Sequence, residues 1–175
     1  EQLGAISALA LAAIAHGVDH SRSWPFISLS SFQQRSLTTR ILSRALFVSI
    51  VPFVSEADRP EWEEFVVDPG ADAEWIEDGY AYQKEVGIDV FEGPDTSGTY
   101  LPLQTIFYTN EAGEQFPSPG PGPYLPHWET SPVLRRHVIN RDLLANQVFA
   151  PTARLSPETE SVVNGSVSYT RLTLP

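Results

Sequence analysis

The segment Arg44-Ala-Leu-Phe-Val-Ser-Ile-Val-Pro-Phe-Val-Ser55 runs directly into Glu56-Ala-Asp-Arg-Pro-Glu-Trp-Glu-Glu-Phe-Val-Val67, and the rest of the chain is organised around this junction. Its first half is a long apolar, β-branched run, which predicts a buried strand over residues 46–54. A helix over 56–67 should follow, because Ser55 supplies a cap and Pro60 lies in the first turn, where its missing N–H costs nothing. A strand that leads into helices within 175 residues indicates one α+β domain.

An amphipathic helix is expected upstream, at the start of the sequence. Residues 2–18 are rich in alanine and carry apolar side chains at intervals of three and four. His16 and His20 lie one turn apart near its end, with Asp19 between them. A zinc site needs further ligands that the sequence does not indicate, so we interpret these residues as a polar helix end.

A second helix should run from Ser30 to about Arg44, since a hydroxyl cap and two glutamines open it. Its spacing predicts an inward face made of Leu37, Ile41 and Leu42. The densest basic cluster of the chain lies on the same helix and consists of Arg35, Arg40 and Arg44. Because arginine suits carboxylates and phosphates, this cluster either pairs with acidic residues of the fold or grips an anionic ligand.

The chain carries a net charge of −11, and one region accounts for most of it. Fourteen acidic residues lie between Glu56 and Asp95 with only two basic ones. Such a surface argues against nucleic acid as a partner, because phosphate contacts need clusters of lysine and arginine. Solvated faces of amphipathic helices explain most of this acidic block. The sequence contains no cysteine, which excludes disulfides and thiolate chemistry.

The second half of the chain alternates expected elements with long loops. A helix over 71–85 should bury a stripe that ends at Gly87 and is made of Trp75, Ile76, Gly79, Tyr80 and Gln83. We further expect a strand over 103–109 closed by a turn over 110–113, and a short helix over 140–146. Segment 116–128 is rich in proline and glycine but too apolar for a free linker, which predicts an ordered loop lying over the domain.

Six motifs occur in an order that carries a family resemblance. They are Trp24-Pro-Phe, Phe32-x-x-Arg35, Ile50-Val-Pro-Phe-Val, Arg59-x-x-Trp62-Glu, Trp75 with Tyr82-Gln83, and Gly120-Pro-Gly-Pro-Tyr-Leu-Pro-His-Trp-Glu-Thr-Ser-Pro132. Over about residues 3–166 the set resembles the ectodomain of the receptor-type nucleotidyl cyclases of diatoms and related algae. That module is similar in layout to CHASE sensor domains, in which a long membrane-proximal helix precedes a PAS-like α/β fold that binds small ligands.

The resemblance implies a place within a larger transmembrane receptor. Such proteins combine a membrane segment, this extracellular module, a second membrane segment and a cytoplasmic class III adenylate or guanylate cyclase domain. Residues 1–166 would then be a partial CHASE-like ectodomain, α+β with a long N-terminal helix and truncated at the C-terminus. It would lie on the extracellular side of a membrane and be held there by segments outside this sequence.

The end of the sequence carries two further features. Residues 167–175, Val-Ser-Tyr-Thr-Arg-Leu-Thr-Leu-Pro, resemble a translated sequencing adapter. We interpret them as a non-native tail, with a genuine terminal strand as the alternative. Asn164 opens an Asn-Gly-Ser sequon, which predicts N-glycosylation on an extracellular surface.

These expectations favour a ligand-sensing domain that works by a population shift. A bound ligand would favour one packing of the PAS-like part against the N-terminal helix, and the helix would pass the change to the membrane. The pocket wall should combine the central strand, the strand of Tyr108 and the loop over 124–128, because small-molecule sites are mostly apolar with a few placed polar groups. The candidate ligand-binding residues, each of which core packing or a structural ion pair could also explain, are Phe32, Arg35, Phe53, Trp62, Tyr108, Tyr124 and Trp128.

Two other functions compete with this interpretation. The first is a structural or dimerisation module, with the alanine-rich residues 3–14 as a homodimer interface. The second is a hydrolase that uses two of the many carboxylates, but no nucleophile elbow, phosphate loop or His-Glu-x-x-His motif is present. We therefore expect no enzyme activity, metal or cofactor in this chain, and cyclase activity only in the parent protein that the resemblance implies.

Overall fold

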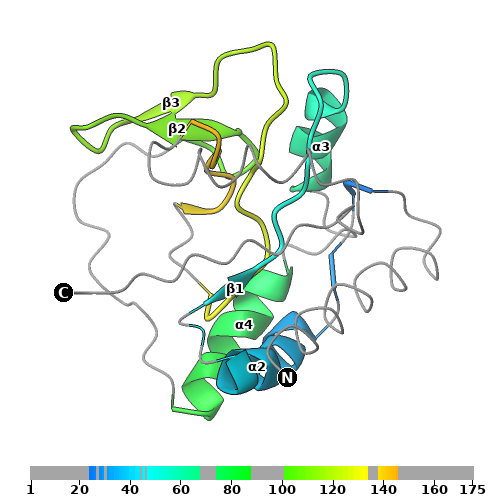
Figure 1. The fold of residues 1–175 in the computed structure, drawn as a ribbon, viewed down its shortest axis with the longest axis vertical. Helices are drawn as coiled ribbons and strands as arrows, with labels where there is room; N and C mark the ends of the chain where they lie inside the picture. Colours follow the sequence, from blue (N-terminus) through cyan, green and yellow to red (C-terminus); the bar gives the residue numbers. More distant parts are fainter. Residues whose placement is uncertain are drawn as a thin grey trace.

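The computed structural model describes residues 24–26, 28–29, 31–43, 45, 47–67, 74–87, 101–133 and 138–145 (Figure 1). Their elements are α2 (Phe32–Ser43), β1 (Val48–Ser49), α3 (Arg59–Phe65), α4 (Glu74–Glu85), β2 (Phe107–Thr109), β3 (Gln115–Pro117) and β4 (Thr130–Ser131). Helices combined with small antiparallel sheets confirm the mixed α+β class. The predictions that lie outside the described residues concern the N-terminal helix with His16 and His20, Arg44, Asn164 and the tail over 167–175.

The predicted central strand forms in part, and it pairs with β4 and with the proline-rich segment over 116–128 that precedes β4. β1 pairs antiparallel with β4, and the pairing continues where the Ile50 N–H donates to the Glu129 carbonyl at 2.8 Å. At the far end, the backbone groups of Val54 and Tyr124 exchange hydrogen bonds of 3.0 and 2.8 Å. The proline-rich segment is therefore ordered, as expected, but it also supplies sheet-like pairing that the sequence analysis did not expect. Pro52 interrupts the ladder because proline has no N–H to donate.

The helix after the junction begins at Arg59 and not at Glu56, because residues 56–58 form a turn. Ser55 caps this turn: its hydroxyl accepts a hydrogen bond from the Asp58 N–H at 3.2 Å and donates to the Asp58 carboxylate at 2.6 Å. Pro60 lies at the start of α3, as predicted. Ser55 and Pro60 thus correctly predicted a helix in this region. Ser55 caps a turn over residues 56–58, and the helix begins after that turn, at Arg59.

An aromatic cluster forms the centre of the core. The ring centroids of Trp62 and Trp128 lie 5.4 Å apart, and those of Trp75 and Trp128 lie 5.5 Å apart, both edge to face. Phe65 packs against Trp62 and Trp128 as well. These contacts pack α3, α4 and the proline-rich segment together. Each ring buries a large apolar area, so the cluster contributes much of the core's stability.

The prediction for the buried face of α2 is wrong. Ile41 and Leu42 are 67% and 56% exposed, and Leu37 is only half-buried. The helix instead buries the face made of Phe32, Gln33, Ser36 and Thr39. This face packs against α4 and β4, where the Gln33 amide donates to the Thr130 carbonyl at 2.7 Å. The small polar side chains permit close approach, and hydrophobicity alone could not have identified them.

The short helix predicted over 140–146 is also wrong for its described part. Residues 138–145 form turns and isolated bridges, which pair Arg141 with Phe107 and Asp142 with Pro126. Asn140 has a φ of 67°, a left-handed conformation that a helix cannot contain. The segment is held by backbone pairing with two distant stretches, so its local sequence pattern did not determine its structure.

The remaining predicted elements are largely confirmed. α4 buries Trp75, Ile76, Gly79 and Gln83 along the expected stripe and is followed by Gly87 with a φ of 70°. The strand expected over 103–109 is shorter, since residues 101–106 are irregular, and β2 pairs with β3 around a turn that contains Gly113. Figure 1 shows this hairpin at the opposite end of the molecule from α2 and α4, with β1 between them.

Candidate functional site

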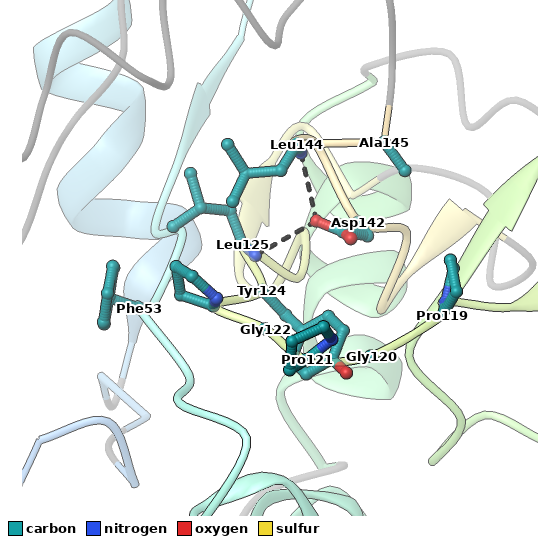
Figure 2. Close-up of a pocket in the computed structure, with 11 residues that line it drawn as sticks. Phe53, Pro119, Gly120, Pro121, Gly122, Tyr124, Leu125, Asp142, Leu144 and Ala145 are labelled. Carbon is teal, nitrogen blue, oxygen red and sulfur yellow. Dashed lines mark hydrogen bonds between the residues drawn. The ribbon is translucent and has the colours of Figure 1, made fainter.

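A cavity of about 450 Å³ opens beside the proline-rich segment (Figure 2). Its volume lies within the range usual for small-molecule sites. One wall comes from the central strand and the proline-rich segment, and the facing wall comes from the turns after Asn140. The lining residues are Phe53, Pro119, Gly120, Pro121, Gly122, Pro123, Tyr124, Leu125, Asp142, Leu144 and Ala145.

The two glycines of this wall permit a close approach of the turn that precedes α3. A Cβ at Gly122 would lie 3.1 Å from both the Glu56 backbone nitrogen and the Tyr124 ring. A Cβ at Gly120 would lie 3.3 Å from the Glu56 carboxylate oxygens. The alternation of glycine and proline therefore combines a close backbone approach with restricted φ angles, which gives a preformed wall.

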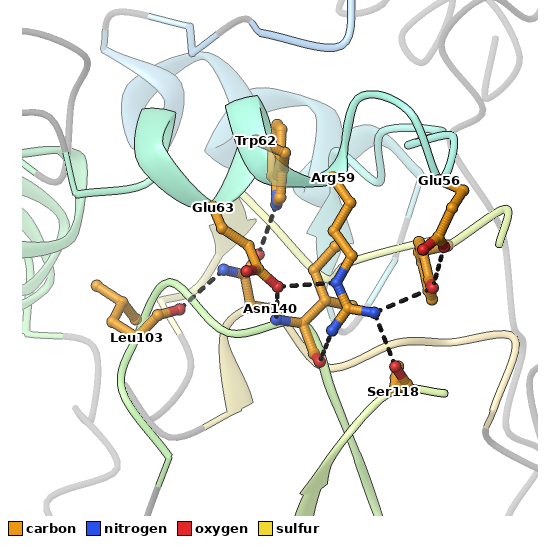
Figure 3. Close-up of polar contacts among 9 residues, drawn as sticks. Glu56, Arg59, Trp62, Glu63, Leu103, Ser118 and Asn140 are labelled. Atoms are coloured by element: carbon orange, nitrogen blue, oxygen red, sulfur yellow. Dashed lines mark hydrogen bonds and ion pairs between the residues drawn. The ribbon is translucent and has the colours of Figure 1, made fainter. Parts of the chain in front are cut away.

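A polar network fixes Tyr124 behind this wall (Figure 3). The Tyr124 hydroxyl donates to the Glu56 carboxylate at 2.5 Å and accepts from Arg59 Nη1 at 3.0 Å. Arg59 also donates to the Ser118 carbonyl at 2.8 Å and forms an ion pair with Glu63 at 3.0 Å. The cavity wall is thus bonded directly to the start of α3.

The charge of Arg59 is well supported in this position. Burial alone would lower its pKa, but the hydrogen bonds to Glu63 and Tyr124 outweigh burial and raise it. Its guanidinium carbon also lies 4.7 Å from the centre of the Tyr124 ring, a cation–π contact. Arg59 therefore remains a cation. It holds the Tyr124 hydroxyl in place but is not itself one of the residues that line the cavity.

Asp142 holds the facing wall in place. One of its carboxylate oxygens, Oδ1, accepts the N–H groups of Leu125 at 3.1 Å and Leu144 at 3.0 Å. Its own N–H donates to the Phe107 carbonyl at 2.7 Å, and the Leu143 N–H donates to the Leu125 carbonyl at 3.0 Å. These bonds link three stretches that are distant in sequence, so the cavity is built on paired backbone.

The structure brings two of the predicted site residues together at this cavity. Phe53 is 44% exposed and lines it, and Tyr124, which is 1% exposed, lines it as well. Trp62 and Trp128 lie in the aromatic core, with 0% and 1% of their surface exposed. Their place in the described structure is that of packing residues behind the wall.

The other three predicted residues lie elsewhere. Tyr108 stacks on Phe116 in the β2–β3 hairpin, with ring centroids 5.7 Å apart. Arg35 is exposed on α2. Phe32 is buried and lines a second cavity of about 420 Å³ between α2 and α4, whose other members include Trp75, Tyr82, Asp78 and Glu85.

Sequence reasoning missed Asp142, Leu144 and Ala145, which line the main cavity. The sequence predicts a helix over 140–146, and a helix would not pair Asp142 with Leu125 and Pro126 as the structure does. The sequence analysis identified the prolines and glycines of 119–123 as part of a motif, but it did not predict that they line the cavity. Their repeated Pro-Gly alternation was the signal, since it prevents both helix and regular strand.

A largely buried polar cluster joins β1 to β4 and to His127, which precedes β4. His127 Nε2 lies 2.5 Å from Ser49 Oγ, and Thr130 Oγ1 lies 2.8 Å from Ser49 Oγ and 3.1 Å from His127 Nε2. Burial, with the nearby charge of Arg141, lowers the pKa of His127 to about 4, so its ring is neutral at neutral pH. A serine beside a neutral histidine has the geometry of an activated nucleophile. However, Ser49 is buried and neither cavity includes it, so we interpret the cluster as structural.

No protein-family model matches the chain, and no curated protein or solved structure matches it either. In the described part of the chain, no helix has the length and apolar character that a membrane crossing requires. Nor do three or more acidic or histidine side chains gather there in a way that could hold a metal ion. The functional interpretation therefore depends on the cavity and on the sequence motifs.

Proposed function

We propose that this chain is a ligand-sensing domain whose cavity beside Phe53 and Tyr124 binds a small molecule with an apolar body. The observation that carries the proposal is the cavity itself, about 450 Å³ in volume and walled by paired backbone. The motif over 120–132, which carries most of the family resemblance, supplies one of its walls. As that resemblance implies, the domain would be the extracellular sensor of a receptor-type nucleotidyl cyclase, with the cyclase domain elsewhere in the parent protein.

The network behind the cavity gives a route for the signal. A ligand in the cavity would lie beside Tyr124, which is 1% exposed and whose hydroxyl is hydrogen-bonded to Glu56 and Arg59 at the start of α3. A ligand shifts a conformational equilibrium only if it binds one state better than the other. The cavity wall and α3 are mechanically linked here, so a ligand that prefers one position of Tyr124 would also select one position of the helix.

Truncation of Phe53 tests the proposal, with phenethyl alcohol as the probe. Covering its exposed surface, 44% of the side chain, is worth about 1–2 kcal/mol, or about tenfold in affinity. Phe53→Ala should therefore weaken binding about tenfold in isothermal titration calorimetry. The matched control is Phe116→Ala, because Phe116 is 41% exposed and lies on β3 outside the cavity. Equal binding by all three proteins would contradict the proposal.

A dimerisation module is the second candidate function. Ile41 and Leu42 expose 67% and 56% of their surface next to each other on α2, which is unusual for a helix that has a buried face. The Ile41→Asp, Leu42→Asp double variant should convert a dimer to a monomer in sedimentation experiments if this patch contributes to the interface. An unaltered protein that sediments as a monomer at high concentration would contradict this candidate.

A further inference from the structure

Among the described residues that line the 450 Å³ cavity, Asp142 is the one with a charged side chain. It retains only 5% of its surface exposed, and the other lining residues are aromatic, aliphatic, proline or glycine. A carboxylate in such surroundings is costly unless hydrogen bonds or an opposite charge compensate it. What satisfies each of its two oxygens therefore bears on what the cavity binds.

The two oxygens of Asp142 have different roles. Oδ1 accepts both backbone hydrogen bonds, from Leu125 at 3.1 Å and from Leu144 at 3.0 Å. Oδ2 receives no hydrogen bond from any residue that the structure describes, and none of the described lysines or arginines lines the cavity. Figure 2 shows the carboxylate pointing toward the space that the labelled residues enclose. One oxygen thus fixes the wall, and the other has no hydrogen-bond donor among the described residues.

We propose that the ligand is an organic cation, a protonated amine whose ammonium group donates to Asp142 Oδ2 and whose apolar body lies against Phe53. This inference rests on the proposed function and adds the ligand's chemical class. A charge-assisted hydrogen bond to an enclosed carboxylate is stronger than a neutral one. The face of an aromatic ring, here that of the 44% exposed Phe53, also favours cations. The net charge of −11 raises the local concentration of cations around the domain.

The test compares phenethylamine, which is protonated at neutral pH, with phenethyl alcohol, which has the same body without the charge. Calorimetric titration of the unaltered protein should give about tenfold or greater preference for the amine. Asp142→Asn keeps Oδ1 as an acceptor for Leu125 and Leu144 and removes the charge, so it should bind both compounds equally. The control Glu114→Gln removes the same charge from an exposed position on the hairpin and should retain the preference for the amine.

The outcomes separate this inference from the proposal on which it rests. If the unaltered protein binds both compounds with equal affinity, the inference about Asp142 is wrong while the cavity remains a binding site. If Asp142→Asn keeps the preference for the amine, the inference is wrong as well. If neither compound binds the unaltered protein, both proposals are wrong.

Discussion

Replacing Trp62 by phenylalanine should destabilise the domain more than the same change at Trp75 or Trp128. All three indoles are buried in one aromatic cluster. Trp62 Nε1 donates to Asn140 Oδ1 at 3.0 Å, and both residues are 0% exposed. The Nε1 atoms of Trp75 and Trp128 are buried without an acceptor among the described residues. The three substitutions therefore remove the same atoms from similar surroundings but differ in one hydrogen bond.

The size of the difference follows from that bond. Removing the Trp62 indole N–H leaves Asn140 Oδ1 buried without a donor, which costs about 1–3 kcal/mol. At Trp75 and Trp128 the same change removes a donor that lacked a partner, and this offsets part of the packing loss. We expect Trp62→Phe to lower the free energy of unfolding by about 2–4 kcal/mol more than either other variant. This is a large share of the total stability of a domain, about 5–15 kcal/mol.

Urea unfolding of each variant measures this difference. Far-ultraviolet circular dichroism is the suitable signal, because tryptophan fluorescence changes with the substitutions themselves. The midpoint should shift with little change in slope if only native-state stability is altered. Equal losses in all three variants would refute the reasoning, since they would show that packing alone sets the cost and that the bond to Asn140 contributes nothing.

Three further substitutions test other parts of the structure. Gly79→Ala should lower the melting temperature, because the added methyl group would overlap the Val133 side chain and overpacking costs about 1–3 kcal/mol. A higher melting temperature, which helix propensity alone predicts, would contradict the close packing of α4. His127 has its pKa lowered from 6.5 to about 4, so the unfolded chain takes up a proton between these values that the folded chain does not. Stability should then fall by about 3 kcal/mol as pH decreases through this interval, and by less in His127→Asn. Equal pH dependence of the two proteins in urea titrations would contradict the lowered pKa of the ring. Tyr124→Phe removes the hydroxyl bonded to Glu56 and should lower the free energy of unfolding by about 1–2 kcal/mol, a loss that unaltered urea midpoints would refute.

The sequence predicted the structure best where local pattern and packing agree. The stripe of α4 from Trp75 to Gln83 is buried as its spacing indicates, because one face of the helix is mainly apolar and the opposite face is charged. The junction at Ser55 also formed a turn and a helix, since hydroxyl capping and proline in the first turn are local effects. Neither result depends on which distant segment lies nearby.

Predictions failed where distant segments determine the structure. α2 buries Ser36 and Thr39 because α4 and β4 approach it closely, and a hydrophobic pattern favours Ile41 and Leu42 instead. At the candidate site, too, residues in a local pattern were predicted and residues placed by distant contacts were not. Phe53 was found from its apolar strand, whereas Asp142 depends on pairing with a segment 17 residues away along the chain, which no local periodicity reveals.

The most direct test of the ligand-sensing account is an amide NMR titration of the unaltered protein with phenethylamine. The account predicts that the largest chemical-shift changes occur at the amides of Leu125 and Leu144, which donate to Asp142 beside the cavity. The amide of Gly113, in the turn of the β2–β3 hairpin, should not change. Changes confined to the hairpin or to the α2–α4 cavity, or no changes at saturating amine, would contradict the account.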